Sequence, residues 1–351
     1  MNFKVGIVGL ANVGKSTLFN ALLKKQVAYA ANYPFATIEP NIGVVPVPDE
    51  RLVKLADLVE KEEGVRPPIV PATVEFVDIA GLVKGASEGQ GLGNKFLSHI
   101  REVSLICHVV RFFEDENIVH VSGKVNPNDD KEVVETELIL ADLQTLQKQS
   151  EPKGKAEKEQ VKRWEIINTL KQTLNSGRPA HETVGDEERM LIADLQLLTM
   201  KPVLYVANVS EDQLKDSYSD ELKISAKIES ELAGLTDDEQ KAYLKELGVE
   251  QSGLERLIQK AYETLGLISF LTAGTIEVRA WTLRRGETAL RASGEIHTDF
   301  MKKFIKAEVI AYDDLVSVGT RAKAKELGKL RIEGREYVMR DGDVVEFKIG
   351  S

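Results

Sequence analysis

Apolar runs of strand length recur along the first part of the chain and again after residue 200. They occupy residues 3–8, 74–79, 105–113 and 202–209, and Thr17–Leu23 has the pattern of the first turns of a helix. Buried strands that alternate with helices build a parallel sheet covered on both faces. The pattern therefore predicts a doubly wound α/β domain, whose ligand is expected at the carboxyl ends of the strands.

Residues 131–199 follow a different, helical pattern. Leucines stand three residues apart at 140, 143 and 146, and apolar residues then repeat at spacings of three and four at Val161, Trp164, Ile167, Leu170 and Leu174. Lysine and glutamate are dense between these stripes, with breaks at 151–154 and 175–179. The segment is therefore predicted to be an inserted antiparallel helical hairpin, whose apolar stripe is most simply its own packing seam.

From about residue 268 onward, short strands and turns are predicted instead. The expected strands are 275–282, 304–309, 330–332, 335–338 and 344–349, with one amphipathic stretch at 298–304. Basic residues gather in this region, namely Lys302, Lys303, Lys306, Arg321, Lys323, Lys325, Lys329, Arg331, Arg335 and Arg340. They form either a solvated face or a basic face that contacts RNA.

Size and composition restrict the class of protein. A chain of 351 residues is long enough for two or three domains, and its 29% charged and 42% hydrophobic residues are typical of a soluble globular protein. The net charge of −10 argues against a general nucleic-acid coat. With Cys107 as the only cysteine no intramolecular disulfide can form, and no apolar run approaches the length of a bilayer span. We expect a cytoplasmic protein with no membrane partner.

The stretch Gly9–Ser16 reads GLANVGKS and matches the phosphate-loop pattern G-x-x-x-x-G-K-[ST]. It lies between a predicted strand and a predicted helix, which directs backbone N–H groups and a helix N-terminus at phosphate oxygens. Lys15 is expected to bind the β- and γ-phosphates as a catalytic cation, and the Ser16 hydroxyl to ligate Mg²⁺. The sequence therefore predicts a nucleotide site.

Two later segments stand where nucleotide switches carry their sensing groups. Thr37 lies in a loop rich in turn-forming residues and is our candidate for sensing the γ-phosphate and Mg²⁺. Asp78 ends an apolar strand and is placed to hold Mg²⁺, and the N–H of Gly81 is expected to meet the γ-phosphate. Leu82 follows, where many GTPases place a glutamine that orients the attacking water. A leucine side chain cannot do this, so another group must position the water.

His120 is our candidate for that group. It lies among β-branched residues in the loop 114–130, after the third predicted strand. A histidine in this position is able either to swing in and position the water or to serve a structural role.

The strand at 202–209 leads into Asn208, Val209, Ser210 and Glu211, where GTPases use N-K-x-D to read guanine. The lysine and the aspartate of that motif are absent here, and a site without its aspartate reader need not prefer guanine, because adenine has neither the N1–H nor the 2-amino group. The S-A-K turn that follows presents the backbone N–H groups of Ser225 and Ala226 to the base. Base preference therefore remains open between ATP and GTP.

In combination these motifs resemble the YchF group of Obg-related P-loop NTPases, over essentially the whole chain. The segments that carry the resemblance are NVGKST, NYPFATIEPN, FVDIAGLVKGAS, GQGLGN, HVSGKVNP, NVSE, GEIHTDF and RDGDVVEF. The resemblance implies a translation-factor-class P-loop domain in residues 1–130 and 200–267, an inserted hairpin in 131–199, and a β-grasp TGS domain in 268–351.

The resemblance also implies hydrolysis of ATP in preference to GTP, and association with the ribosome, of which we expect the large subunit to be the partner. By matching position it assigns Mg²⁺ to Ser16 and Thr37. Base contacts fall on Asn208, Val209 and Glu211, and phosphate contacts on Asn12, Val13, Gly14, Lys15, Ser16 and Thr17.

The sequence thus predicts a ribosome-associated ATPase that regulates translation or a stress response. The alternatives are a GTP-hydrolysing switch of the Obg type and a non-catalytic module that uses nucleotide only to hold its shape. A potassium ion near Asn12 is a further hypothesis, motivated by the asparagine in the phosphate loop.

Overall fold

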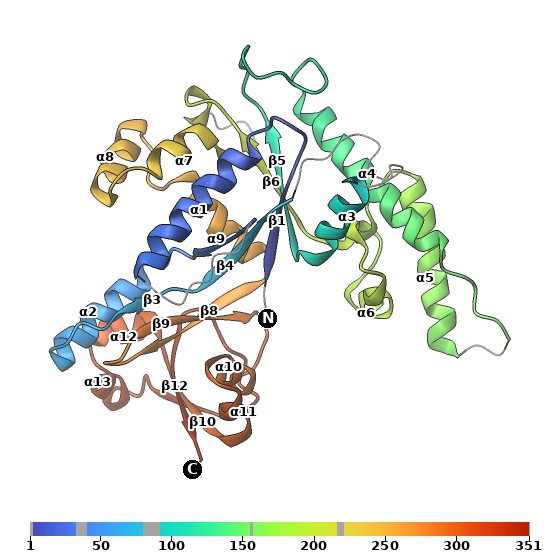
Figure 1. The fold of residues 1–351 in the computed structure, drawn as a ribbon. Helices are drawn as coiled ribbons and strands as arrows, with labels where there is room; N and C mark the ends of the chain where they lie inside the picture. Colours follow the sequence, from blue (N-terminus) through green and yellow to red (C-terminus); the bar gives the residue numbers. More distant parts are fainter. Residues whose placement is uncertain (1–2, 33–40, 80–91, 155–156, 216–220, 351) are drawn as a thin grey trace. The chain divides into compact units, whose positions relative to one another are not determined.

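The computed structural model describes residues 3–32, 41–79, 92–154, 157–215 and 221–350. Thr37, Gly81 and Leu82 lie outside these ranges. The chain divides into two compact units, the first made of residues 1–45 and 75–257, and the second of residues 46–74 and 258–351. The ribbon is shown in Figure 1.

The first unit is built on a six-stranded sheet with the order β2-β4-β1-β5-β6-β7. β1 pairs in parallel with β4 and β5, and β6 pairs in parallel with β5 and β7. The strands are β1 (Lys4–Val8), β2 (Ile42–Pro46), β4 (Thr73–Asp78), β5 (Leu105–Arg111), β6 (Val203–Asn208) and β7 (Leu222–Ile224). The predicted strands at 3–8, 74–79, 105–113 and 202–209 are confirmed.

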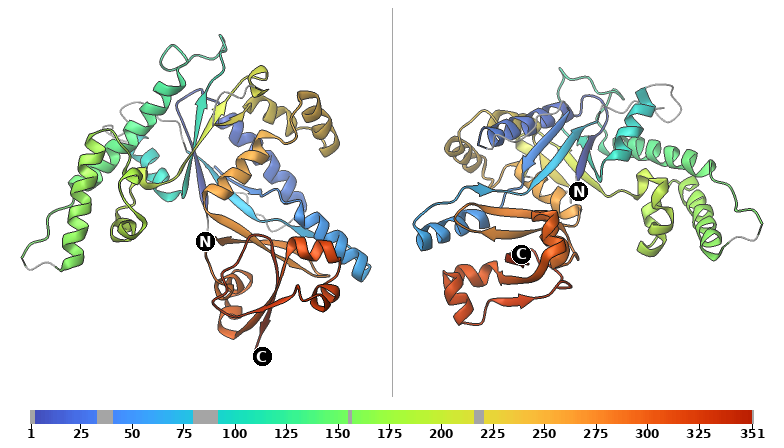
Figure 2. Two further views of the ribbon diagram at one scale, coloured as in Figure 1. Left: turned by 180° about the vertical axis from the view of Figure 1, so that it is seen from behind. Right: turned by 60° about the horizontal axis from the view of Figure 1, so that its bottom comes forward.

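Helices cover both faces of this sheet, as Figures 1 and 2 show: α1 and α7 lie on one face, α3 and α4 on the other. All residues of β5 are buried, as expected for a central strand of such a sheet. The doubly wound α/β fold predicted from the sequence is therefore confirmed. Outside the insertion, the α-helices described in this unit are α1 (Lys15–Asn32), α3 (Leu92–Glu102), α7 (Ala226–Leu232) and α8 (Asp237–Leu247). α9 (Gly253–Thr264) crosses the division between the units at residue 258.

The segment between β5 and β6 is helical, as the apolar spacing predicted. It contains α4 (Pro127–Gln147), α5 (Lys158–Asn175) and α6 (Asp186–Ile192). α4 and α5 share an apolar core that includes Leu143, Leu146, Leu170 and Leu174. Most of the predicted stripe is thus an internal packing seam, but Leu140 (36% exposed) and Val161 (43% exposed) lie on the surface, so their assignment to the seam was wrong.

The second unit contains a mixed sheet with the order β11-β10-β12-β8-β9-β3. β10 is antiparallel to β11 and β12, β8 is antiparallel to β9, and β12 and β8 are parallel. The strands are β3 (Ile69–Val70), β8 (Leu267–Ala273), β9 (Val278–Arg284), β10 (Phe304–Ala311), β11 (Arg331–Glu333) and β12 (Asp343–Ile349).

Residues 46–74 belong to this second unit although they precede it by almost two hundred residues. They contain α2 (Arg51–Glu63), and the Arg51 guanidinium donates to Asp49 at 2.7 Å and to Asp341 at 2.8 Å. β3 adds a parallel edge to β9 through the pairing of Ile69 with Val278. The sequence pattern did not indicate this association, because the Arg51–Asp341 contact and the pairing of β3 with β9 join residues far apart in the chain.

Some local predictions for the C-terminal region are wrong. Residues 335–338 form a turn and one isolated bridge between Val338 and Thr288, so no strand exists there. The strand predicted at 275–282 begins only at Val278, because a turn precedes it in which the Gly274 N–H donates to the Glu277 carbonyl. The amphipathic stretch predicted at 298–304 corresponds to α11 (Thr298–Lys303). Three further short helices were not predicted, namely α10 (Ala289–Ile296), α12 (Tyr312–Val318) and α13 (Arg321–Glu326).

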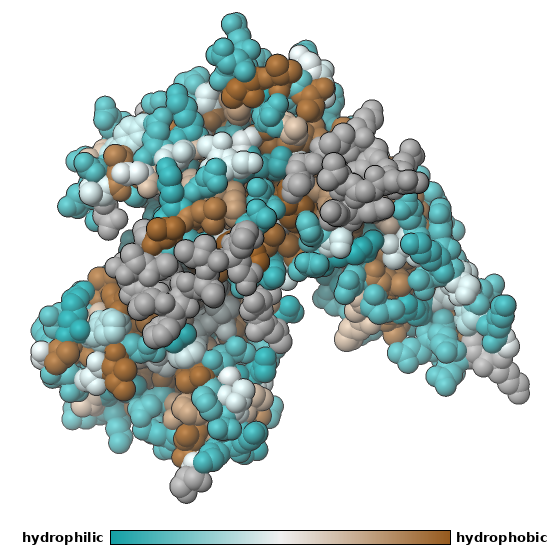
Figure 3. All heavy atoms as spheres, viewed as in Figure 1, coloured by the Kyte–Doolittle hydropathy of each residue, from teal (hydrophilic) through white to brown (hydrophobic). Residues whose placement is uncertain are grey.

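On the face shown in Figure 3, hydrophilic residues predominate and the hydrophobic ones form small groups. Over the described ranges, no helix is both long enough and apolar enough to cross a membrane.

Candidate nucleotide-binding site

The phosphate loop connects β1 to α1 through backbone conformations that a regular element does not adopt. Asn12 has a φ of 62° and Gly14 a φ of 97°, and α1 begins at Lys15. A Cβ atom on Gly14 would lie 2.2 Å from the Asn208 side-chain nitrogen. Glycine is therefore required at position 14 both by the left-handed φ and by the close approach of Asn208.

Lys15 is a buried cation, with only 7% of the residue exposed. Its ammonium donates to the Leu10 carbonyl at 2.5 Å. Burial lowers its pKa to about 8, against the opposing effect of Asp78, and burial also raises the pKa of Asp78 against the effect of Lys15. A nucleotide phosphate would supply the negative charge that this partly desolvated ammonium requires.

Asn208, at the end of β6, joins the phosphate loop to the base loop, defined as Ser225 and Ala226 at the start of α7. Its side-chain nitrogen donates to the Val13 carbonyl at 2.9 Å, and its side-chain oxygen accepts from the Ala226 N–H at 3.0 Å. The residue is 4% exposed. Two segments more than 190 residues apart are thus held in one geometry by a single amide.

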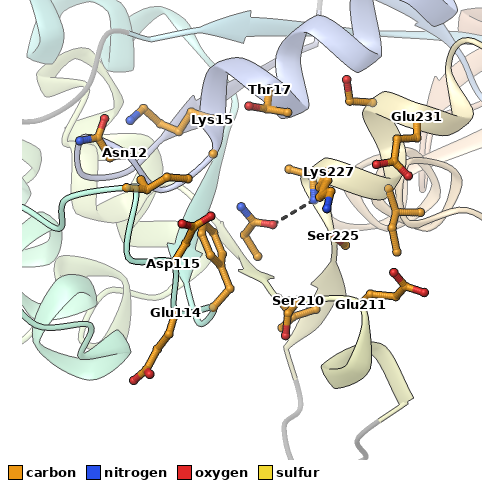
Figure 4. A pocket seen from close by; sticks show the side chains of 18 of the residues that line it. Asn12, Lys15, Thr17, Glu114, Asp115, Ser210, Glu211, Ser225, Lys227 and Glu231 are labelled. Carbon is orange, nitrogen blue, oxygen red and sulfur yellow. Dashed lines mark hydrogen bonds between the residues drawn. The ribbon is translucent and has the colours of Figure 1, made fainter.

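These elements surround a cavity of about 820 Å³ (Figure 4). In Figure 4, Asn12, Lys15 and Thr17 lie on one side, and Ser210, Glu211 and Ser225 on another. The predicted residues that line the cavity are Asn12, Gly14, Lys15, Ser16, Thr17, Asn208, Val209, Glu211, Ser225 and Ala226. Val13 is buried behind the loop and contributes its carbonyl to Asn208.

Part of the cavity wall was not predicted from the sequence. Phe113, Asp115 and Ile118 line it from the loop that follows β5, and Lys227 and Glu231 line it from α7. The position of that loop at the carboxyl end of a central strand was a usable signal, since ligands bind at this edge of doubly wound sheets. Nothing in the spacing singled out the individual side chains.

His120 is not in the cavity wall. It is 6% exposed, and its Nε2 lies 3.0 Å from Oδ2 of Asp130. Nδ1 accepts a hydrogen bond from the Ser122 N–H at 3.2 Å, which assigns the proton to Nε2. In this conformation the imidazole is held by α4, and it must leave Asp130 before it can contact a ligand.

A family model described as 50S ribosome-binding GTPase matches residues 4–148, and a model of the YchF GTPase C-terminal domain, described as a protein of unknown function, matches residues 267–350. The chain is 50% identical over 369 residues to "Ribosome-binding ATPase YchF" of Bacillus subtilis, with 99% of each chain covered. The chain belongs to the YchF family.

Other YchF proteins show the same full-length similarity. The Escherichia coli O157:H7 protein of the same description is 48% identical, with 99% of each chain covered. The solved structure of the Schizosaccharomyces pombe YchF GTPase superposes with a TM-score of 0.86 at 38% identity, covering 99% of this chain and 98% of that one. The two bacterial relatives are described as ATPases and the yeast relative as a GTPase, which makes the base pocket the informative part of the site.

The described residues of this YchF protein include suitable ligands for Mg²⁺. Ser16 offers a hydroxyl at the start of α1, and Asp78 offers a carboxylate at the end of β4, beside β1. No cluster of three His, Cys, Asp or Glu side chains able to hold a metal occurs in the described part of the chain. Mg²⁺ usually takes only one or two protein ligands and completes its shell with phosphate and water, so this sparse set fits the ion.

Proposed function

We propose that this protein is a ribosome-binding ATPase that hydrolyses ATP to ADP and phosphate. The observation that carries the proposal is the cavity formed by the phosphate loop and the base loop, with the buried Lys15 ammonium beside it. Full-length similarity to proteins described as ribosome-binding ATPases supports it. A ribosomal partner would place the protein in the cytoplasm.

The reaction is attack of water on the γ-phosphate, and the chain contributes mainly charge and positioning. Lys15 and the backbone N–H groups of Asn12–Thr17 bind the phosphate oxygens, where their dipoles are already oriented. We assign Mg²⁺ to Ser16, Asp78 and Thr37, and a γ-phosphate contact to the N–H of Gly81. When bound, Mg²⁺ would neutralise charge that develops on the phosphate oxygens.

We assign the positioning of water to His120, because the Leu82 side chain cannot form a hydrogen bond. The imidazole is neutral in the tautomer set by Ser122. After release from both Asp130 and the Ser122 N–H, its Nδ1 lone pair and Nε2–H are able to accept from and donate to a water molecule. Movement of the loop that carries His120 would thus belong to the catalytic cycle.

We infer that the base pocket prefers adenine. Val209 and Glu211 replace the lysine and aspartate of the guanine motif, and Asn208, Ser225 and Ala226 line the same cavity. The Ala226 N–H, which the sequence assigned to the base, donates to the Asn208 side-chain oxygen instead. The Phe113 ring in the cavity wall offers a face on which either purine stacks. The rival is a GTPase of the Obg type, which the descriptions of the matched N-terminal family and the yeast relative favour.

The deciding experiment is titration of the purified protein with ATP and GTP in the presence of Mg²⁺. The same titration is made on the double variant Val209→Lys, Glu211→Asp. Tighter binding of ATP by the wild type, with a shift toward GTP in the variant, is expected. Tighter binding of GTP from the start would overturn the adenine preference and leave the phosphate chemistry intact.

A second proposal concerns K⁺ near Asn12. The Asn12 side-chain nitrogen donates to the Val119 carbonyl at 3.0 Å, so the amide oxygen is the atom suited to a cation. Hydrolysis should then be faster in potassium than in sodium chloride at equal ionic strength. Equal rates in the two salts would remove K⁺ from the mechanism.

We place the ribosomal contact on the large subunit, in keeping with the 50S in the description of the matched family. The basic residues of the C-terminal region could contribute to ribosome binding through RNA. Fewer of them are available than the sequence suggested, because Lys306, Arg321 and Arg331 are paired with carboxylates. On α13, Lys323 and Lys325 are exposed. Their double substitution to glutamate should weaken cosedimentation with ribosomes, and unchanged cosedimentation would exclude them.

Single-turnover hydrolysis with saturating ribosomes distinguishes the proposed ATPase from a non-catalytic binding module. A module that uses ATP only to hold its shape would leave the bound nucleotide intact over many half-lives of the ribosome complex. An ATPase should convert it to ADP, and Lys15→Ala is the control without the phosphate-binding cation.

A further inference from the structure

Arg111, the last residue of β5, is buried to an extent unusual for its type. The residue is 1% exposed and is among the largest fully buried side chains of the described chain. Burial of an arginine requires compensation, since its charge loses the solvation of water. Its observed partners are backbone carbonyls of the loop that follows it.

The three hydrogen bonds of Arg111 all reach that loop. Nε donates to the Phe113 carbonyl at 3.0 Å, Nη1 to the Ile118 carbonyl at 3.0 Å, and Nη2 to the Asp115 carbonyl at 3.3 Å. The planar guanidinium presents these donors in fixed directions, so it determines the path of residues 113–118. A lysine ammonium lacks this geometry.

Arg111 also contacts the Phe113 ring directly. The guanidinium carbon lies 4.4 Å from the centroid of the ring. An arginine plane against an aromatic ring combines cation–π attraction with stacking and restricts the orientation of the ring. The same loop is attached to the phosphate loop at its other end, where the Val119 carbonyl accepts from Asn12 at 3.0 Å.

The segment held by Arg111 is part of the nucleotide cavity, through Phe113, Asp115 and Ile118. We propose that Arg111 is a positioning residue for the nucleotide: it holds the Phe113 ring as a preformed platform for the purine base. This inference rests on the proposed function. It predicts that the contribution of Arg111 to affinity depends on the base and not on the phosphates.

The experiment compares ATP with inorganic tripolyphosphate, both with Mg²⁺, as ligands of the full chain and its Arg111→Lys variant. ATP binding is expected to weaken about tenfold, as for loss of one base–aromatic stack, while tripolyphosphate binding stays unchanged. Arg163→Lys is the matched control, because Arg163 also donates to a backbone carbonyl and lies in the helical insertion. Equal weakening of both ligands would overturn the proposal.

A double-mutant cycle with Phe113→Leu tests the route of the effect. If Arg111 acts through the ring, Arg111→Lys should cause no further loss of ATP affinity once Phe113 is leucine. Additive losses would show that Arg111 acts elsewhere. Failure of the wild type to bind any nucleotide would instead refute the proposed function itself.

Should Arg111→Lys not fold, Phe113→Trp in the otherwise unchanged chain tests the platform. The added tryptophan should retain ATP affinity, and its fluorescence should change on addition of ATP and not of tripolyphosphate. Loss of ATP affinity, or fluorescence that does not respond to ATP, would overturn the proposal.

Discussion

The Nε2 atom of His120 lies 3.0 Å from Oδ2 of Asp130, and both side chains are 3% exposed. Asp130 lies in the first turn of α4, so the start of the helical insertion holds this histidine. The pair gives His120 a role in holding the loop, which is distinct from its proposed role in positioning water.

Substitution of His120 by glutamine should lower the turnover of ATP at least about tenfold, because it removes the imidazole that we propose to position water. ATP affinity should stay unchanged, since His120 is outside the cavity wall. His120→Ala should also lower the unfolding free energy, by about 1–3 kcal/mol, because the buried Asp130 carboxylate loses its donor. Single-turnover rates and chemical unfolding measure both effects. An unaltered rate in both variants would reduce His120 to its structural role.

The lowered pKa of Lys15 predicts a pH-dependent affinity for ATP. Its folded-state pKa is about 8 instead of 10.5, because burial disfavours the ammonium. Bound phosphate stabilises the ammonium, so binding takes up a proton above pH 8, and affinity should fall by up to about tenfold per pH unit there. Titrations at pH 7, 8 and 9 test this. Lys15→Arg keeps its charge over this pH range, so its ATP affinity should not depend on pH. Equal ATP affinity of the wild type at pH 7 and pH 9 would contradict the prediction.

The effect of Lys15 on the stability of the fold changes with pH in the opposite direction to its effect on ATP affinity. Between pH 8 and 10.5 the unfolded chain retains the Lys15 proton and the folded chain does not. The contribution of Lys15 to the free energy of unfolding therefore increases with pH across this window. Comparison of the wild type with Lys15→Met isolates the contribution, and parallel pH profiles of stability would argue against it.

Gly14→Ala should impair ATP binding and lower the unfolding free energy. The positive φ alone costs about 1 kcal/mol, and the new Cβ would lie 2.2 Å from the Asn208 amide that joins the two loops. Gly177→Ala is the matched control. Gly177 has a φ of 76° with nothing within 4 Å of its Cβ position, so only the backbone cost applies there. Equal loss of stability and unchanged ATP affinity in both variants would show that the Asn208 contact is unimportant.

Arg51→Lys should destabilise the second unit by about 1–2 kcal/mol, since a lysine cannot bind Asp49 and Asp341 with the same fork of donors. Arg66→Lys is the comparison, because Arg66 also contacts two carboxylates but is solvent-exposed. That change should have no measurable effect on stability. Thermal unfolding distinguishes them, and identical midpoints for both variants would contradict the role assigned to Arg51.

The sequence by itself determined the nucleotide chemistry and the class of fold. The phosphate loop, the apolar strands and the leucine stripes are local patterns, and neighbouring residues encode them through backbone preference and periodicity. The four sequence-predicted strands of the first sheet were therefore confirmed. In the C-terminal region the local signal was weaker: residues 335–338 were predicted as a strand and form a turn.

Only the tertiary structure decided which distant residues act together. Asn208 joins Val13 to Ala226, Arg51 joins α2 to Asp341, and His120 is withdrawn from the cavity by Asp130. The contacts of Asn208 and Arg51 depend on the packing of elements that lie far apart in the chain, and that of His120 depends on how its loop folds against the helix that follows. A single sequence carries no periodic signal for such contacts. The loop that Arg111 holds depends on both sources of information. The apolar strand pattern predicted where this loop begins, and the buried guanidinium determines which side chain the loop presents to the nucleotide.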